Sequence, residues 1–274
     1  MMQIAVVGLG LMGGSLALGV KQSDTKVVGF DMNQKHCQSA LELSLIDGIV
    51  SFDDIKKSDI IILAVPVEAI IKITQNLKDI APTTTVIDLG STKEAIVNSI
   101  PPSIRVNFVA AHPMTGTEKH GPKAALSDLY KDKIVVLCNT EANSQLHKQR
   151  AHQLFNQLSM KIVTMDAKAH DMHAAFISHM PHALSFALAK AVLSQEDPKS
   201  ILTLAAGGFK DMSRLAKSSP QMWSEIFKQN QKNLLLSIEC FENELAKCKM
   251  MVEKGDFEAM DEWIKQANKL HHIL

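Results

Sequence analysis

The sequence has 274 residues, of which 46% are hydrophobic and 21% charged, so it can bury a sizeable core in one large or two smaller domains. Its 29 basic residues equal its 29 acidic residues, so no net field attracts nucleic acid or an anionic membrane, and we expect neither as a partner. The four cysteines show no CxxC spacing, which argues against a disulfide framework or a cysteine zinc site and favours the reducing cytoplasm. No apolar run reaches the length of about 18 residues that a membrane-spanning helix needs.

Short apolar runs rich in β-branched residues recur through the first half of the chain and predict its strands. These runs lie at 4–10, 26–31, 59–66, 84–91, 107–113, 133–138 and 161–166. Most are continuously apolar, as is typical of strands that are covered on both faces. Because segments with helical spacing separate the runs, the pattern predicts a doubly wound, Rossmann-type parallel α/β sheet.

The second half of the chain, from Ala167 onward, shows only helical spacing, interrupted at Pro198, Pro220 and Gly255. Within 220–254 one apolar face predicts a single long helix, and its members are Trp223, Ile226, Phe227, Leu234, Ile238, Phe241, Leu245, Cys248 and Val252. We therefore expect two domains, a Rossmann domain over 1–165 and an all-helical domain over 166–274.

The glycine-rich stretch GLGLMG follows the first predicted strand and opens a helix. It contains Gly8, Gly10 and Gly13, with Leu11 and Met12 between the last two. Glycines at this spacing allow the backbone to approach a pyrophosphate, and free N–H groups at the helix N-terminus receive its charge. The motif alone also fits a tight turn, but its position between strand and helix favours a dinucleotide site.

Asp31 ends the second predicted strand, 21 residues after Gly10. A carboxylate there can accept hydrogen bonds from both ribose hydroxyls and repels a 2′-phosphate, so we predict NAD rather than NADP. The alternative is that Asp31 serves a turn or a helix cap. Val65 and Pro66, in LAVPVEAI, follow another strand and are expected at the nicotinamide end of the cofactor.

Ser91 lies in DLGSTKEAI, again directly after a predicted strand. It is a candidate polar group of the site, but Ser91 or Thr92 with Glu94 equally fits a cap of the next helix. His112, in AAHPMTGTEKHGP, falls at the same carboxyl edge of the sheet. A histidine can accept the proton of an alcohol at neutral pH, as oxidation by NAD requires, although a buried structural histidine is the alternative.

Two further clusters lie in the helical half. His170 and His173 are three residues apart, as are His179 and His182, so each pair can share a helical face. No carboxylate or thiolate set completes a metal site, and we expect none. In AAGGFKDMSRLAKSSPQMW, Arg214 beside a glycine break fits a clamp for a substrate carboxylate, with a solvated Asp211–Arg214 pair as the alternative.

Together, GLGLMGGSLA, DLGSTKEAI, AAHPMTGTEKHGP, FISHMPHALSFALA and GGFKDMSRLAKSSPQMW resemble the prephenate dehydrogenase family, which includes arogenate and cyclohexadienyl dehydrogenases. The resemblance covers nearly the whole chain and implies NAD-dependent oxidative decarboxylation of prephenate to 4-hydroxyphenylpyruvate on the route to tyrosine. It also implies that the helical half forms a homodimer. Thr115 departs from the family pattern, in which we expect alanine after HPM.

The resemblance also implies roles for single residues. His112 resembles the residue that takes the ring-hydroxyl proton, and Ser91 resembles the serine that orients this histidine and the hydroxyl. The implied substrate-binding set is His182, Arg214, His179, Thr117, Glu118 and Trp223. Within that set Glu118 resembles a gating carboxylate and Trp223 a side chain that reaches toward the neighbouring subunit. Outside the set, Asp211 resembles an ion-pair partner of Arg214.

Other readings make different predictions. Arogenate carries two carboxylates, as prephenate does, so the same cations fit either substrate or a dual-specificity enzyme. A β-hydroxyacid dehydrogenase or imine reductase shares the two-part organisation but relies on a catalytic lysine in its helical half. A sensor that binds NAD without catalysis predicts cofactor binding with no turnover.

Overall fold

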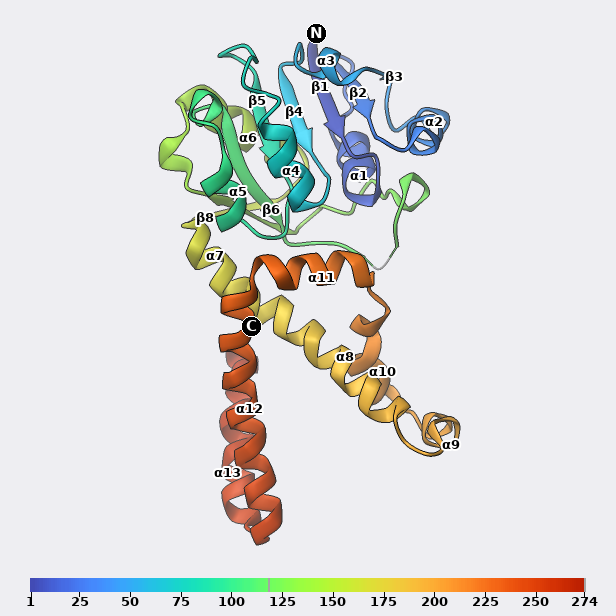
Figure 1. Ribbon diagram of the computed structural model, residues 1–274, viewed down its shortest axis with the longest axis vertical. Coiled ribbons are helices and arrows are strands. Elements are labelled where there is room, and N and C mark those ends of the chain that lie inside the picture. Colours follow the sequence, from blue (N-terminus) through green and yellow to red (C-terminus); the bar gives the residue numbers. More distant parts are fainter. Residues whose placement is uncertain (118, 274) are drawn as a thin grey trace.

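An eight-stranded sheet with helices against it forms the first half of the chain in the computed structural model, which describes residues 1–117 and 119–273 (Figure 1). The strands are β1 (Met2–Val7), β2 (Thr25–Phe30), β3 (Gly48–Ile49), β4 (Ile60–Leu63), β5 (Thr85–Asp88), β6 (Phe108–Pro113), β7 (Ile134–Cys138) and β8 (Lys161–Met165). All seven predicted strands are confirmed. The additional strand, β3, has 2 residues and is too short to show a pattern in the sequence.

The strand order is β3-β2-β1-β4-β5-β6-β7-β8, and β1 to β6 are mutually parallel, as a doubly wound sheet requires. The predicted doubly wound parallel sheet is confirmed, with one reversal at its end, where β7 runs antiparallel to β6 and β8 runs parallel to β7. A parallel return needs a crossover connection, usually a helix, and no α-helix is described between β6 and β7.

Strands β1, β2 and β4 to β7 are buried on both faces, which explains why they are continuously apolar, whereas the edge strand β8 is largely exposed. In β1, Ile4 and Val6 belong to one hydrophobic cluster, whereas Ala5 and Val7 belong to the other. The helices of this half are α1 (Leu11–Val20), α2 (Gln34–Glu42), α3 (Phe52–Ile55), α4 (Val67–Thr74), α5 (Glu94–Ser99) and α6 (Gln145–Gln157). The core thus lies in two layers, and the carboxyl ends of the parallel strands open toward the helical half (Figure 1).

The second half is helical throughout its described part, as predicted. Its elements are α7 (Ala167–Ala174), the π-helical segment η4 (Ala175–His179), α8 (Met180–Leu193), α9 (Pro198–Thr203), α10 (Gly207–Ser213), the 3-10 segment η5 (Arg214–Lys217), α11 (Pro220–Gln229), α12 (Gln231–Lys254), α13 (Phe257–Asn268) and the 3-10 segment η6 (Lys269–His272). Pro198 and Pro220 each begin a helix, and Gly255 ends α12 with φ 65°, as helix punctuation predicts.

The single long helix predicted over 220–254 is wrong, because the chain breaks into α11 and α12 at Asn230. The backbone of Asn230 leaves the helical region, with φ −109° and ψ 30°. Its side chain donates to the carbonyl oxygen of Asp171 at 2.6 Å, so a tertiary contact overrides the helical pattern. As a result α11 lies below the sheet, and α12 runs away from it (Figure 1).

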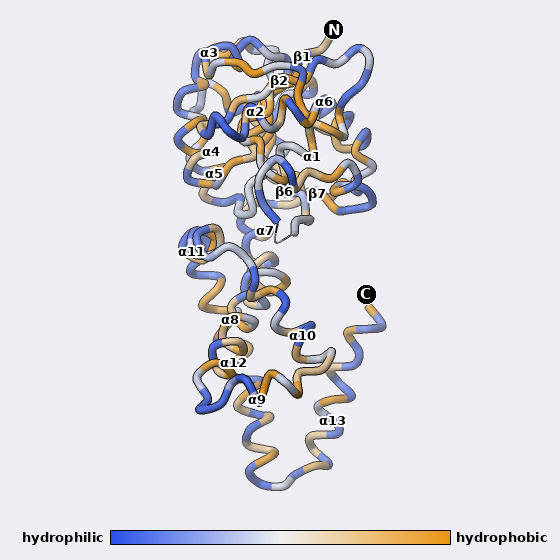
Figure 2. The backbone as a smooth tube through the Cα atoms, turned by 90° about the vertical axis from the view of Figure 1, so that its right-hand side faces the viewer, coloured by the Kyte–Doolittle hydropathy of each residue, from blue (hydrophilic) through white to orange (hydrophobic). Residues whose placement is uncertain are grey.

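Helices α12 and α13 form an antiparallel pair that projects away from the sheet (Figure 2). Apolar and polar stretches alternate along both helices, and several large apolar side chains in them are exposed. Within the described parts of the chain, no helix is both long and apolar enough to cross a membrane.

Candidate active site

The glycine loop joins β1 to α1 and lacks the atoms that would block a phosphate. A Cβ on Gly8, where φ is +92°, would collide with the carbonyl oxygen of Ala64, and a Cβ on Gly13 would collide with that of Gly8. At Gly10 a Cβ would point into open space. Gly10 is also the N-cap of α1 and offers no side-chain cap, so N–H groups of the first turn are left for an anion.

Buried hydrogen bonds fix the start of α1. One of them involves Met12, which belongs to the predicted cofactor-binding set. The hydroxyl of the buried Tyr130 donates to the carbonyl oxygen of Met12 at 2.8 Å. The Ser15 hydroxyl accepts a hydrogen bond from the backbone N–H of Leu126 at 2.9 Å. The segment after β6 therefore packs on the helix that carries the glycine loop.

Asp31 lies directly after β2, and its carboxylate connects to the glycine loop. Its Oδ2 accepts a hydrogen bond from the backbone N–H of Leu9 at 2.8 Å, and its Oδ1 accepts one from Asn33 N at 2.8 Å. The side chain retains 15% exposure. Asp31 thus combines the turn role with a partly exposed carboxylate at the position that the NAD prediction requires.

Val65 and Pro66 follow β4, on the same edge of the sheet. The Val65 side chain lies against Gly8, because a Cβ on Gly8 would meet Val65 Cγ1 at 2.6 Å. Pro66 is the N-cap of α4 and is exposed. The structure thus brings this loop beside the glycine loop, as the strand-end rule predicts.

His112 lies in β6 and begins a chain of hydrogen bonds that crosses into the helical half. Its Nδ1 lies 2.8 Å from His170 Nε2, and His170 Nδ1 lies 2.8 Å from Asp171 Oδ1. Because a carboxylate only accepts, His170 carries its proton on Nδ1 and accepts through Nε2. His112 therefore donates from Nδ1, which leaves its Nε2 unprotonated and able to take up a proton.

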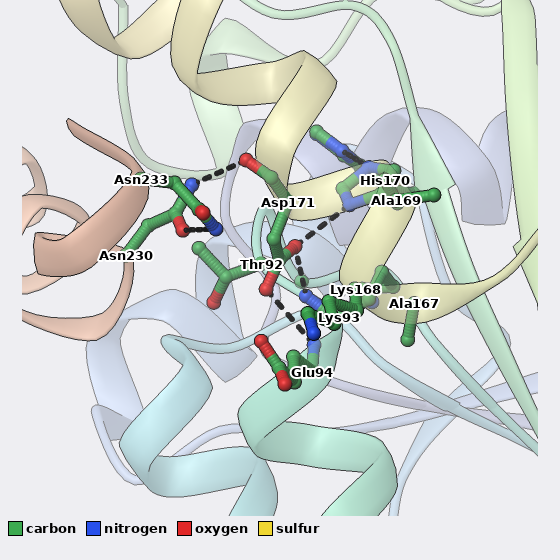
Figure 3. Close-up of polar contacts among 12 residues, drawn as sticks. Thr92, Lys93, Glu94, Ala167, Lys168, Ala169, His170, Asp171, Asn230 and Asn233 are labelled. Atoms are coloured by element: carbon green, nitrogen blue, oxygen red, sulfur yellow. Dashed lines mark hydrogen bonds and ion pairs between the residues drawn. The ribbon is translucent and has the colours of Figure 1, made fainter. Parts of the chain in front are cut away.

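Asp171 anchors the far end of this chain and caps α5 from the other half of the molecule (Figure 3). Its Oδ1 accepts from Lys93 N at 2.8 Å and its Oδ2 accepts from Glu94 N at 2.9 Å. The N-cap of α5 is Lys93, with no side-chain cap of its own, so the predicted capping alternative for Ser91 or Thr92 is wrong.

Ser91 and Thr92 have other surroundings. The Thr92 hydroxyl donates to Gln229 Oε1 in α11 at 2.8 Å, which ties the loop after β5 to the helical half. Ser91 is partly exposed beside it. His170, rather than Ser91, holds the Nδ1 of His112.

The surroundings of His112 keep its imidazole neutral. Burial is the main cause that holds its pKa well below the ordinary histidine value, and the neighbouring charges of His170, Lys93 and His179 act in the same direction. A neutral imidazole with a free Nε2 is the form that can accept a proton at neutral pH. The second ring in the chain, His170, is 2% exposed, whereas His173 is exposed, so these two histidines do not share one environment.

His179 and His182 lie where the helix from α7 to α8 contains the π-helical segment. His182 stacks on the Trp223 ring with 3.5 Å between centroids, and His179 meets the same indole edge-on at 6.0 Å. His182 donates from Nδ1 to the carbonyl oxygen of Ser178 at 2.8 Å, which leaves its Nε2 free to accept. Burial lowers the pKa of His179 to about 4.

Burial also lowers the pKa of His182, and the nearby Arg214 guanidinium adds to this effect, whereas the Ser178 contact opposes it. Arg214 itself is exposed at the start of η5. Within the described residues no ion pair joins it to Asp211. Arg214 thus stands beside His182 with its charge available to an anion.

The loop after β6 carries the remaining predicted residues. Thr117 is exposed, and its hydroxyl accepts from Lys119 N at 3.2 Å. The prediction for Glu118 lies outside the described residues. Thr115, the departure from the family pattern, donates to the carbonyl oxygen of Leu129 at 3.1 Å, so its hydroxyl serves the loop.

Trp223 is 6% exposed and contacts His182 of its own chain, rather than extending away from it. Among the residues that the structure describes, no group accepts a hydrogen bond from its indole Nε1.

Sequence reasoning gave no role to Asp171, Lys93 or Asn230, and it considered His170 only as half of a pair with His173. The one signal was the HD dipeptide at the start of the helical half.

A glycine loop and an acidic strand end on a doubly wound sheet, with a neutral imidazole on the same edge, define a dinucleotide-dependent dehydrogenase. Two family models cover the chain. One, described as prephenate dehydrogenase, nucleotide-binding domain, matches residues 15–164, and the other, prephenate dehydrogenase, dimerization domain, matches residues 166–266. The chain belongs to the prephenate dehydrogenase family.

Individual relatives agree along the whole chain. A prephenate dehydrogenase of Lactococcus lactis is 31% identical over 284 residues, which cover 100% of this chain and 78% of that protein. The crystal structure of Aquifex aeolicus prephenate dehydrogenase with hydroxyphenyl propionate and NAD+ is 31% identical with a TM-score of 0.93, covering 100% of this chain and 99% of that one. Synechocystis arogenate dehydrogenase is 28% identical with a TM-score of 0.84, covering 98% and 99%.

Proposed function

We propose that this protein oxidises prephenate with NAD and releases 4-hydroxyphenylpyruvate and carbon dioxide, within the synthesis of tyrosine. The observation that carries the proposal is the hydrogen-bond chain from Asp171 through His170, which leaves Nε2 of His112 unprotonated. This atom belongs to a residue at the carboxyl edge that also bears the glycine loop. The family to which the chain belongs supports the substrate.

The residues fit NAD as the cofactor. Gly8, Gly10 and Gly13 hold the pyrophosphate, with the backbone of Leu11 and Met12 at the helix N-terminus. The Asp31 carboxylate binds the ribose hydroxyls and repels a 2′-phosphate. Val65 and Pro66 line the nicotinamide end. When bound, NAD supplies the acceptor for the hydride.

His112 takes the proton of the ring hydroxyl on Nε2 while the hydride leaves the same ring carbon. The resulting imidazolium donates from Nδ1 to His170, and the Asp171 carboxylate stabilises the added charge through that contact. The carbon–carboxylate bond then breaks, and its electron pair enters the ring, which becomes aromatic. The task of the protein is thus to orient the substrate and to hold one proton.

Substrate anions are bound from the helical half. Arg214 binds one carboxylate, and Nε2 of His182 accepts a hydrogen bond beside it, with the ring held flat against Trp223. Ser91 contacts the hydroxyl that is oxidised. His179, Thr117 and Glu118 complete the substrate-binding set, Glu118 being a gating carboxylate.

The protein forms a homodimer through its helical half, in the cytoplasm, and its two domains meet between residues 165 and 166. Dimerisation is supported by exposed large apolar side chains along the helices, among them Leu193, Leu204, Met212, Leu235, Leu236, Leu245, Val252 and Phe257. Apolar side chains that gather on an exposed surface mark interaction sites. All four cysteines are free thiols, which suits a reducing compartment.

The test is the appearance of reduced-nicotinamide absorbance with purified protein, in four parallel reactions that combine prephenate or arogenate with NAD or NADP. Turnover of prephenate with NAD is the expected result. Turnover of arogenate alone would move the protein to the other substrate of the same reaction. Silence in all four reactions, together with tight NAD binding, would replace the proposal with a sensor that lacks catalysis.

A further inference from the structure

Lys93 contacts both ends of the hydrogen-bond chain that serves His112, and it uses different atoms for each end. Its backbone N–H donates to Asp171 Oδ1 at 2.8 Å. Its side-chain Nζ donates to the carbonyl oxygen of Ala111, the residue before His112, at 2.7 Å. The same Nζ forms an ion pair with Asp88, and both side chains are 0% exposed.

The Lys93–Asp88 ion pair binds the backbone of β6 just beyond the point where the pairing of β5 with β6 ends. Pairing of β5 with β6 ends at Asp88 opposite Ala110. One residue further on, the Ala111 N–H donates to Asp88 Oδ1 at 3.2 Å, and the Ala111 carbonyl accepts from Lys93. The pair therefore binds both backbone polar groups of the residue that precedes His112, which fixes the direction in which that imidazole leaves the strand.

Two buried charges are a poor way to stabilise a fold, because apolar residues of similar volume are often as stabilising. A charged pair instead adds short, directional hydrogen bonds that fix the positions of the polar atoms it joins. Here Lys93 connects the backbone of Ala111 to the start of α5, where the N–H groups of Lys93 and Glu94 donate to Asp171.

We propose that Lys93 is a positioning residue that holds His112 and Asp171 in register, so that His112 Nδ1 keeps its hydrogen bond to His170. The expected effect of Lys93 on kcat rests on the proposed function, whereas its expected effect on the tautomer of His112 does not. The two are therefore measured separately.

The geometric test uses the double variant Lys93→Met/Asp88→Asn, which leaves no lone buried charge. The matched control is Lys21→Met/Asp47→Asn. In that second pair Lys21 Nζ lies 2.8 Å from Asp47 Oδ1. Asp47 also accepts a hydrogen bond from the N–H of a strand residue, Val27, at 2.7 Å. Ring nitrogen-15 spectra of histidine-labelled full-length protein without ligand report the tautomer of each imidazole, and His112→Asn assigns the His112 signals.

In the wild type and in the control, His112 should show a single tautomer protonated at Nδ1. In the double variant its signals should shift toward a mixture of tautomers. Unchanged His112 signals in a folded double variant would overturn the proposal. If that variant does not fold, Lys93→Leu/Asp88→Asn, which likewise leaves no lone buried charge and removes the Lys93 Nζ contact with Ala111, is read by the same spectra and decides in the same way.

The kinetic test compares the same variants with prephenate and NAD. We expect kcat of Lys93→Met/Asp88→Asn to fall by about ten-fold or more, which corresponds to about 1.4 kcal/mol, with the KM for NAD changed by less than about two-fold. A kcat within about two-fold of both wild type and control would contradict the proposal. If the wild type does not turn over prephenate, the proposed function fails, and the spectra still decide the role of Lys93.

Discussion

Replacing Asp171 with asparagine tests the hydrogen-bond chain at its buried end. The carboxylate accepts from His170 Nδ1 and Lys93 N on Oδ1 and from Glu94 N on Oδ2. An amide has one oxygen, which keeps the first two hydrogen bonds only if its NH2 group faces the Glu94 N–H. Because a buried donor without an acceptor costs about 1–3 kcal/mol, we expect the free energy of unfolding to fall by that amount.

The same substitution removes the charge that stabilises a proton on His112. The His112 imidazolium would then donate to a His170 that is hydrogen-bonded to a neutral amide in place of the carboxylate. General-base catalysis as a whole contributes about 100- to 10,000-fold to the rate. We expect kcat to fall by about 10- to 100-fold, or about 1.4–2.7 kcal/mol. The KM for NAD should stay within about two-fold, because none of the glycine-loop contacts involves Asp171.

The assay pairs urea unfolding with initial rates of NADH formation, and Asp166→Asn is the control. Asp166 is the N-cap of α7, the helix that contains Asp171, and accepts from Lys168 N at 2.9 Å and from Ala169 N at 3.1 Å. Asparagine is an equally good N-cap, so the control should change neither stability nor rate. If Asp171→Asn lost stability but kept full kcat, Asp171 would be a helix cap only, and the reasoning would be refuted.

Three further predictions concern the same site. His112→Asn should lower kcat by about 100-fold or more while NAD binding, measured by fluorescence titration, is retained; unchanged kcat would remove His112 as the proton acceptor. Asp31→Asn keeps an acceptor for Leu9 N–H but loses the charge that repels a 2′-phosphate, so the preference for NAD over NADP in kcat/KM should fall by about ten-fold. Because the pKa of His179 lies at about 4 in the folded protein, unfolding takes up a proton below the ordinary value of about 6.5. Stability is therefore present above about pH 6.5 and is lost toward about pH 4, by up to about 3 kcal/mol from this group, and a flat urea midpoint across that window would contradict the burial of a neutral His179.

Most strands were predictable because β1, β2 and β4 to β7 are covered on both faces. All of β4, for example, is buried, and the sequence shows it as an unbroken apolar run. A run of that kind carries no direction, so the reversal of β7 and β8 had no signal in it. The break at Asn230 was hidden for a related reason, since the apolar residues on both sides keep the helical period.

The site was predictable only where one rule applied, namely that the carboxyl ends of parallel strands meet at one edge. That rule predicted that Gly10, Asp31, Ser91 and His112 lie at one edge, and their strands do end there. It could not find His170, which lies 58 residues beyond His112 and enters from a helix of the other half. Helical spacing instead paired His170 with His173, which is exposed.

The contacts of Asp171 join the edge of the sheet that carries His112 to the helical half. Its carboxylate orients His170 and caps α5, while its backbone carbonyl accepts from Asn230, the residue that separates α11 from α12. That break lets α11 lie below the sheet with Trp223 against His182. One residue therefore sets both the tautomer of the proposed base and the direction of the helix that carries the substrate-side aromatic ring. The orientation of His170 and the position of α11 thus both depend on Asp171, the first through its carboxylate and the second through its backbone carbonyl. Among the contacts described, its side chain touches neither the glycine loop nor Arg214.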